Sequence, residues 1–246
     1  MESKIIEILG VIFTILFVLS VHELGHLLTG LAQGFRFELF VVGPLGIKRE
    51  DKKIKIYLNK NLAYYGGVAA ALPVDDNPKN IQKFANLILA GPIASLVLAV
   101  IILVSILLFN LPGEKFFNIA ALASIGIFLA TTVPSKSGSF FTDRKRYQRL
   151  MSDGVARETE IALLRITGIY GRDDSYKNID INDIELVIKD ENYQYFGLFT
   201  KLSYQYENYG SFDENTKFQL DELKPEMPKA FVKVVETELQ KLTVKK

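Results

Sequence analysis

The 246-residue chain contains no cysteine and no tryptophan, and it has only two histidines. Without cysteine it can form neither a disulfide framework nor a thiolate metal site. Its net charge is +1, whereas a dedicated nucleic-acid binder usually has a clear excess of basic residues. We therefore expect no nucleic-acid partner.

Charge is also missing from two long stretches, 84–113 and 116–135. A helix needs about 20 mainly apolar residues to cross a bilayer, and both stretches are long enough. A third apolar run follows Lys4 and continues without the small-residue cleavage site of a signal peptide. The sequence predicts three membrane-spanning helices, at roughly 5–32, 82–110 and 116–133.

The segments outside these runs differ in character. In the connector 34–80, FRFELFVVGPLGIKRE and KIKIYLN alternate like strands and predict a small β-hairpin sheet. Residues 62–73 are apolar but too short to span, which fits a re-entrant loop buried against protein. Residues 144–246 are polar with apolar positions at helical spacing, so we expect a soluble, mostly helical tail. The fold class is thus a mainly α, polytopic membrane protein with a β-hairpin connector and a helical C-terminal tail.

Basic residues predict the orientation of the three spans. Cytosolic loops are enriched in lysine and arginine. The loop 111–115 has only Lys115, and the residues directly after the third span have five basic side chains. The connector has eight: Arg36, Lys48, Arg49, Lys52, Lys53, Lys55, Lys60 and Lys79. This distribution predicts an N-terminus outside the cell, with the connector and the C-terminal tail in the cytosol.

Both histidines lie in the first apolar run, in the stretch LSVHELGHLL, residues 19–28. His22, Glu23 and His26 form an H-E-x-x-H pattern. On a helix, positions i and i+4 share one face, so the two imidazoles can bind one zinc ion beside Glu23 as general base. Ionisable residues are costly inside a membrane and by default mark function there. A buried polar cluster without catalysis is the alternative.

A catalytic zinc site has three protein ligands and an open position for water. The chain has no third histidine and no cysteine, so the third ligand has to be a carboxylate. Asp143, just after the third span, lies on the predicted cytosolic side, toward which the motif also lies. Glu38, Asp75 and Asp76 share that side but have the sequence context of connector surface. We predict one zinc ion bound by His22, His26 and Asp143.

The H-E-L-G-H motif at 22–26, within a first membrane helix, resembles the site-2 protease family of intramembrane zinc metallopeptidases. The resemblance covers roughly residues 5–150 and includes an Ala-Gly-Pro motif in the second span, at 90–92. The family usually continues that motif to an asparagine thought to hold the substrate backbone, and Ser95 stands there in this chain. The resemblance thus implies a substrate-binding role for Ser95.

The resemblance also bears on the third ligand. In the family this ligand is usually the aspartate of an Asp-Gly pair that follows a proline-rich turn. Here Pro134 precedes Asp143, and Arg144 replaces the glycine. The resemblance implies a transmembrane metalloprotease core, placed at 1–143, and the helical spacing of the polar residues 144–246 predicts a cytosolic helical domain after it.

The residues and the resemblance together predict an intramembrane zinc endopeptidase that cuts a peptide bond within or beside a membrane segment. Strand edges in 37–58 can hold an extended substrate, with Gly66 and Gly67 allowing close backbone approach, although a simple turn explains these glycines equally well. The partners expected are a membrane protein or peptide substrate and the lipid bilayer, with a possible protein partner for the cytosolic tail. A membrane scaffold or chaperone with a structural metal site is the alternative, which would have no need of Glu23. The sequence does not separate regulator cleavage from cleavage of small peptides.

Overall fold

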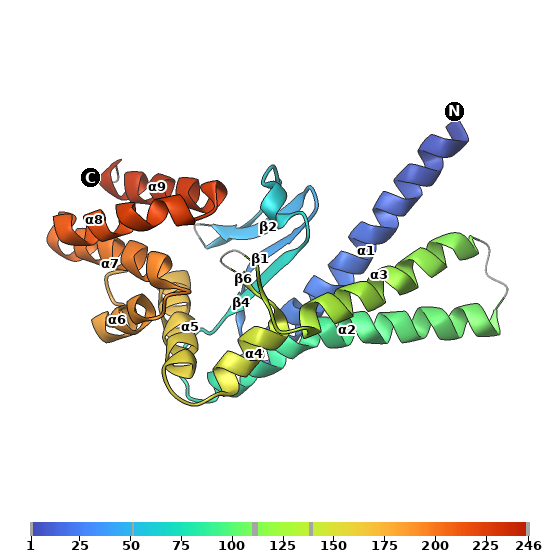
Figure 1. Cartoon of the computed structure of the whole chain (residues 1–246), viewed down its shortest axis with the longest axis horizontal. Coiled ribbons are helices and arrows are strands. Elements are labelled where there is room, and N and C mark those ends of the chain that lie inside the picture. Colours follow the sequence, from blue (N-terminus) through green and yellow to red (C-terminus); the bar gives the residue numbers. More distant parts are fainter. Residues whose placement is uncertain (1, 51, 110–112, 138–139, 245–246) are drawn as a thin grey trace. The chain divides into compact units, whose positions relative to one another are not determined.

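The computed structural model is mainly helical, with nine α-helices and a small antiparallel sheet among the residues that it describes: 2–50, 52–109, 113–137 and 140–244 (Figure 1). Two compact units divide the chain. The first comprises 1–71, 82–135 and 142–147, and the second comprises 72–81, 136–141 and 148–246.

Three helices of the first unit are long and apolar enough to cross a membrane: α1 (Glu2–Ala32), α2 (Asn80–Leu108) and α3 (Glu114–Thr132). They confirm the three predicted spans. Val18, Ile102 and Ala121 form a buried contact among them, one residue from each helix. Phe13 and Leu107, in contrast, have exposed fractions of 73% and 83%. Large apolar side chains so exposed on every span are typical of surfaces that face lipid.

The motif lies close to the end of α1. Gly34 ends this helix because it adopts a φ of +87°, which favours glycine. The amide of Phe35 then donates to the carbonyl of Gly30 at 2.9 Å, and the amide of Gly34 donates to that of Leu31 at 3.0 Å. These bonds satisfy the last helical carbonyls and turn the chain into the sheet.

The connector forms a four-stranded sheet in the order β3-β2-β1-β4. Its strands are β1 (Arg36–Val42), β2 (Leu45–Glu50), β3 (Lys53–Leu58) and β4 (Val68–Leu72). The predicted hairpin strands are therefore present, with antiparallel pairing of β1 with β2 and of β2 with β3. The stretch 62–73 differs from a re-entrant loop, because it forms the short 3₁₀ helix η1 (Leu62–Tyr64) and then the outer strand β4.

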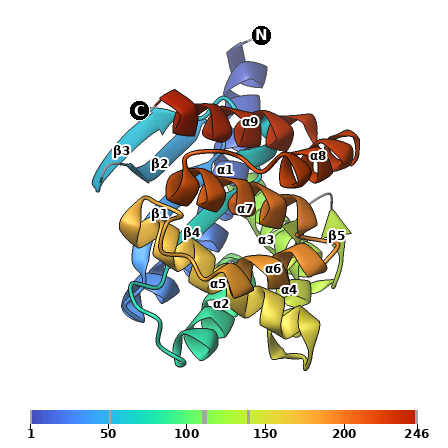
Figure 2. The same ribbon diagram turned by 90° about the vertical axis from the view of Figure 1, so that its left-hand side faces the viewer.

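Helix α4 (Asp143–Met151) follows two short strands, β5 (Lys136–Ser137) and β6 (Phe140–Phe141). The helices of the second unit are α5 (Val155–Asp173), α6 (Ile181–Lys189), α7 (Gln194–Tyr209), α8 (Glu214–Leu223), η2 (Lys224–Glu226) and α9 (Lys229–Val244). Helix α7 contacts α6 on one side and α8 and α9 on the other, as both views show (Figures 1 and 2). Leu198, Leu202 and Ile184 are among the fully buried side chains of this core.

A charged cluster is buried in the second unit. The Arg149 guanidinium donates to Glu160 at 2.8 Å and also to Asp190. The hydroxyl of Tyr193 donates to the same Glu160 carboxylate at 3.0 Å. Glu160 is fully buried, so these hydrogen bonds offset part of the cost of burying its carboxylate.

Candidate metal centre

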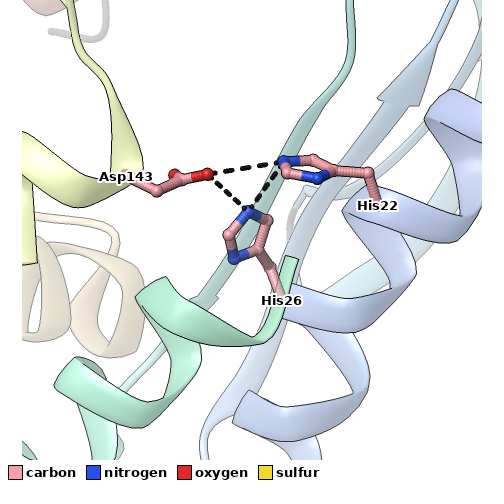
Figure 3. Close-up of side chains that lie close together, drawn as sticks. All are labelled: His22, His26 and Asp143. Carbon is pink, nitrogen blue, oxygen red and sulfur yellow. Dashed lines mark hydrogen bonds and ion pairs between the residues drawn. The ribbon is translucent and has the colours of Figure 1, made fainter. Parts of the chain in front are cut away.

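Helix α1 presents both histidines on one face. His22 and His26 are buried, and their Nε2 atoms lie 3.2 Å apart (Figure 3). The i, i+4 spacing on a helix produces this pairing, as the sequence predicts. Both rings therefore offer a nitrogen to the same point.

Asp143 brings the third donor atom from 117 positions further along the chain than His26. Its Oδ2 lies 3.4 Å from Nε2 of His22 and 3.5 Å from Nε2 of His26 (Figure 3). Thr142 fixes the preceding turn, because its hydroxyl donates to the carbonyl of Val133 at 2.9 Å and accepts from the amide of Ser135 at 3.1 Å. The start of α4 is thus tied to the end of α3.

The triangle of donor atoms fits a tetrahedral zinc ion. With bonds of about 2.0–2.1 Å, the edge of the coordination tetrahedron is roughly 3.3 Å. The three observed separations are 3.2, 3.4 and 3.5 Å. In addition, Oδ2 of Asp143 is buried and makes no hydrogen bond, although buried carboxylates normally do. A cation between the three donors would satisfy it.

The protonation pattern of the rings agrees with this reading. Nδ1 of His26 lies 2.8 Å from the carbonyl of Leu87, which can only accept, so Nδ1 holds the ring proton. In the neutral ring Nε2 then has the free lone pair, and it faces the carboxylate oxygen of Asp143 as a metal-binding nitrogen would. Nδ1 of His22 lies 2.9 Å from the hydroxyl of Ser95. Second partners of this kind orient metal-binding histidines.

Asp143 is suited to be an anionic ligand. Burial by itself raises the pKa of its carboxyl, but the neighbouring His22 and His26 lower that pKa to about 2. The carboxylate is therefore charged at neutral pH. Arg144, which departs from the family pattern, is exposed with its guanidinium 5.7 Å from the centre of the Tyr147 ring.

Glu23 lies beside the histidines and is buried. The backbone of Ala69, in β4, donates a hydrogen bond to its carboxylate. Gly67 packs against the same side chain with a φ of +103°, and a Cβ added there would lie 2.5 Å from Oε1 of Glu23. Gly66 has no such neighbour, because a Cβ at that position would have nothing within 4 Å. Of the two predicted glycines, Gly67 alone is in close contact with Glu23.

Small residues let α2 approach α1 at the motif. A Cβ at Gly25 would lie 2.6 Å from the carbonyl oxygen of Ala90, and one at Gly91 would lie 2.1 Å from Nε2 of His26. Such small-residue contacts bring membrane helices together. Pro92 lies inside α2 and lacks an amide hydrogen, so it cannot donate to the carbonyl of Ile88 four residues earlier. The carbonyl of the preceding residue, Leu87, anchors His26. The steric role of Gly91 was not predicted from the sequence, although the Ala-Gly-Pro motif marked its position.

Within the described part of the chain, His22, His26 and Asp143 are the group of histidine and carboxylate side chains whose arrangement can hold a metal ion. The sequence model of peptidase family M50, the site-2 protease family, matches residues 10–244. The chain belongs to this family. No curated protein and no solved structure matches.

Membership in family M50 implies intramembrane metallopeptidase activity. The metalloproteases of this family depend on zinc and act on membrane proteins in the lipid bilayer. The three apolar helices agree with an integral membrane protein. The match also extends beyond the predicted core into the helical tail.

Proposed function

We propose that this M50 protein is an intramembrane zinc endopeptidase with His22, His26 and Asp143 as the metal ligands. The observation that carries the proposal is the triangle of donor atoms with edges of 3.2, 3.4 and 3.5 Å. A zinc ion held there supplies a Lewis acid that activates water and polarises the carbonyl of the scissile bond.

Glu23 is the proposed general base. Its carboxylate takes the proton from the attacking water and then returns it to the leaving amine, so one residue serves both half-steps. Its burial beside the two histidines and its bond from the backbone of Ala69 support this role by fixing its position. A metal site with a purely structural purpose would not require this carboxylate.

An extended substrate segment is proposed to lie along β4. This strand is at one edge of the sheet, with β3 at the other edge. It begins directly after Gly67, which packs against Glu23, and an edge strand can add a further strand through backbone hydrogen bonds. We keep Gly66 and Gly67 as proposed substrate-binding residues, since Gly66 borders open space into which a substrate backbone fits.

The orientation of the protein is proposed from its basic residues. The connector and the segment after α3 are rich in lysine and arginine, which supports a cytosolic location for both and an N-terminus outside the cell. The proposed division is a metalloprotease core at 1–143 and a cytosolic helical domain at 144–246. That domain is a candidate for binding a protein partner.

One set of variants tests the proposed chemistry. The full chain is purified in detergent, and zinc content and cleavage of a membrane-spanning reporter are measured for wild type, Glu23→Gln, His22→Ala and Asp143→Ala. We expect about one zinc per chain in wild type and Glu23→Gln, and loss of zinc in the other two. Cleavage should be lost in all three variants. Glu7→Gln is the matched control, since Glu7 lies on the same helix, is paired with Lys115 and is remote from the motif in sequence.

Two results would contradict the proposal. Full zinc retention in Asp143→Ala would remove that residue from the ligand set. Unchanged cleavage in Glu23→Gln would reject the enzymatic role and favour a scaffold with a structural metal. Offering the reporter as a membrane segment and as a short soluble peptide also distinguishes the two substrate classes.

A further inference from the structure

Ser95 uses its hydroxyl differently from comparable serines in the membrane helices. The hydroxyls of Ser20 and Ser105 donate to the carbonyl four residues earlier on their own helix, at 2.7 and 2.8 Å. This local bond is the usual one for a helical serine. The Ser95 hydroxyl instead lies 2.9 Å from Nδ1 of His22, which is 73 residues away and on another helix.

The direction of this bond follows from the position of the other ring nitrogen. Nε2 of His22 faces Asp143 at 3.4 Å and therefore has to be unprotonated to bind a metal. The ring proton then lies on Nδ1, so Nδ1–H donates and the Ser95 hydroxyl accepts. The Ser95 hydroxyl can accept this bond, so it supports the tautomer that a metal at Nε2 requires and fixes the rotation of the imidazole.

The two histidines are anchored in different ways. His26 donates to the backbone carbonyl of Leu87, which no side-chain substitution can remove. His22 depends on a side chain, that of Ser95. Ser95 is also completely buried and thus has no surface left for a substrate.

We propose that Ser95 is a positioning residue for the metal ligand His22. It prepares the ring nitrogen for the metal and does not touch the substrate, which differs from the substrate-binding role that the resemblance implies. The inference rests on the proposed zinc site but concerns a residue outside the ligand set. Its consequence is that metal affinity, measured without any substrate, depends on a hydroxyl at position 95.

The test measures the zinc dissociation constant of the full chain in detergent by competition with a chromophoric chelator. Loss of a partner behind a metal ligand typically weakens metal binding about 10–100-fold, and this is the decrease expected for Ser95→Ala. Ser105→Ala is the matched control, because it removes a serine hydroxyl from the same helix where the bond is local. Its zinc affinity should equal that of wild type.

A second pair of variants isolates the hydroxyl from side-chain volume. Thr and Val have nearly the same shape and differ by the hydroxyl, so Ser95→Thr should bind zinc more tightly than Ser95→Val by a similar factor. The visible spectrum of the cobalt-substituted protein should shift for Ser95→Ala and Ser95→Val but not for Ser105→Ala. Melting of the metal-free chains verifies that each variant is folded.

Two results would overturn the inference. One is wild-type zinc affinity in Ser95→Ala together with a raised KM, which would assign Ser95 to substrate binding. The other is equal zinc affinity in the Thr and Val variants. If wild type itself binds no zinc, the proposed function fails first, so the two failures are distinguishable.

Discussion

Gly91 provides the space that the imidazole of His26 occupies, and its replacement by alanine should remove the metal. The added Cβ would lie 2.1 Å from Nε2 of His26, whereas contacts under 3.0 Å essentially do not occur. The ring therefore has to move by about 1 Å or more, while metal–ligand distances tolerate only about 0.2 Å. The ring cannot move freely, because its Nδ1 is held 2.8 Å from the carbonyl of Leu87.

We expect Gly91→Ala to bind zinc more than about 100-fold more weakly than wild type. This exceeds the loss of about 10–100-fold that is typical when a residue hydrogen-bonded to a metal ligand is removed. Overpacking costs the fold about 1–3 kcal/mol, which is less than the typical stability of a folded domain, about 5–15 kcal/mol, so the chain should still fold. Gly126→Ala is the matched control, because a Cβ on this α3 glycine meets nothing within 4 Å. Competition with a chromophoric chelator in detergent measures the zinc affinity of both variants. Wild-type zinc affinity in Gly91→Ala would refute the steric argument and with it the placement of His26.

The remaining predictions concern the general base and the buried charges. Gly67→Ala should abolish cleavage while zinc content stays at the wild-type level, because the new Cβ displaces the Glu23 carboxylate and the φ of +103° disfavours alanine. Retained cleavage would contradict the contact between Gly67 and Glu23. Arg149→Ala should destabilise the helical tail by about 3–5 kcal/mol, because it leaves Glu160 buried without its guanidinium partner. Thermal unfolding followed by circular dichroism measures this loss, and the exposed Arg172→Ala, expected to cost under about 1 kcal/mol, is its comparison.

The parts of the site that sequence reasoning predicted depend on local spacing or on chain topology. His22, Glu23 and His26 follow from the helical repeat alone. Asp143 follows from the number of spans and from the lack of any other nitrogen or sulfur ligand. The three spans follow from the length of the charge-free runs. None of these predictions depends on knowing which faces of the helices pack against each other.

The parts of the site that were not predicted depend on which face of α2 packs against α1. Helix α2 is apolar on all sides, so its sequence has no polar stripe to indicate the buried face. The roles of Gly91 and Ser95 both depend on which face of α2 is buried against α1. Strand β4 is similar, since its Val-Ala-Ala-Ala-Leu sequence has little intrinsic preference for a strand and it forms one by joining the sheet beside β1.

The separation of the ligands along the chain has a consequence for biosynthesis. His26 leaves the ribosome 117 residues before Asp143, the proposed third ligand, and His22 leaves it 121 residues before. At synthesis rates of about 5–20 residues per second, the nascent chain has two of the three proposed ligands for roughly 6–23 seconds. The second and third apolar helices are made during that interval, while the proposed metal site is incomplete. The proposed zinc site can therefore be completed only after all three apolar helices have been synthesised.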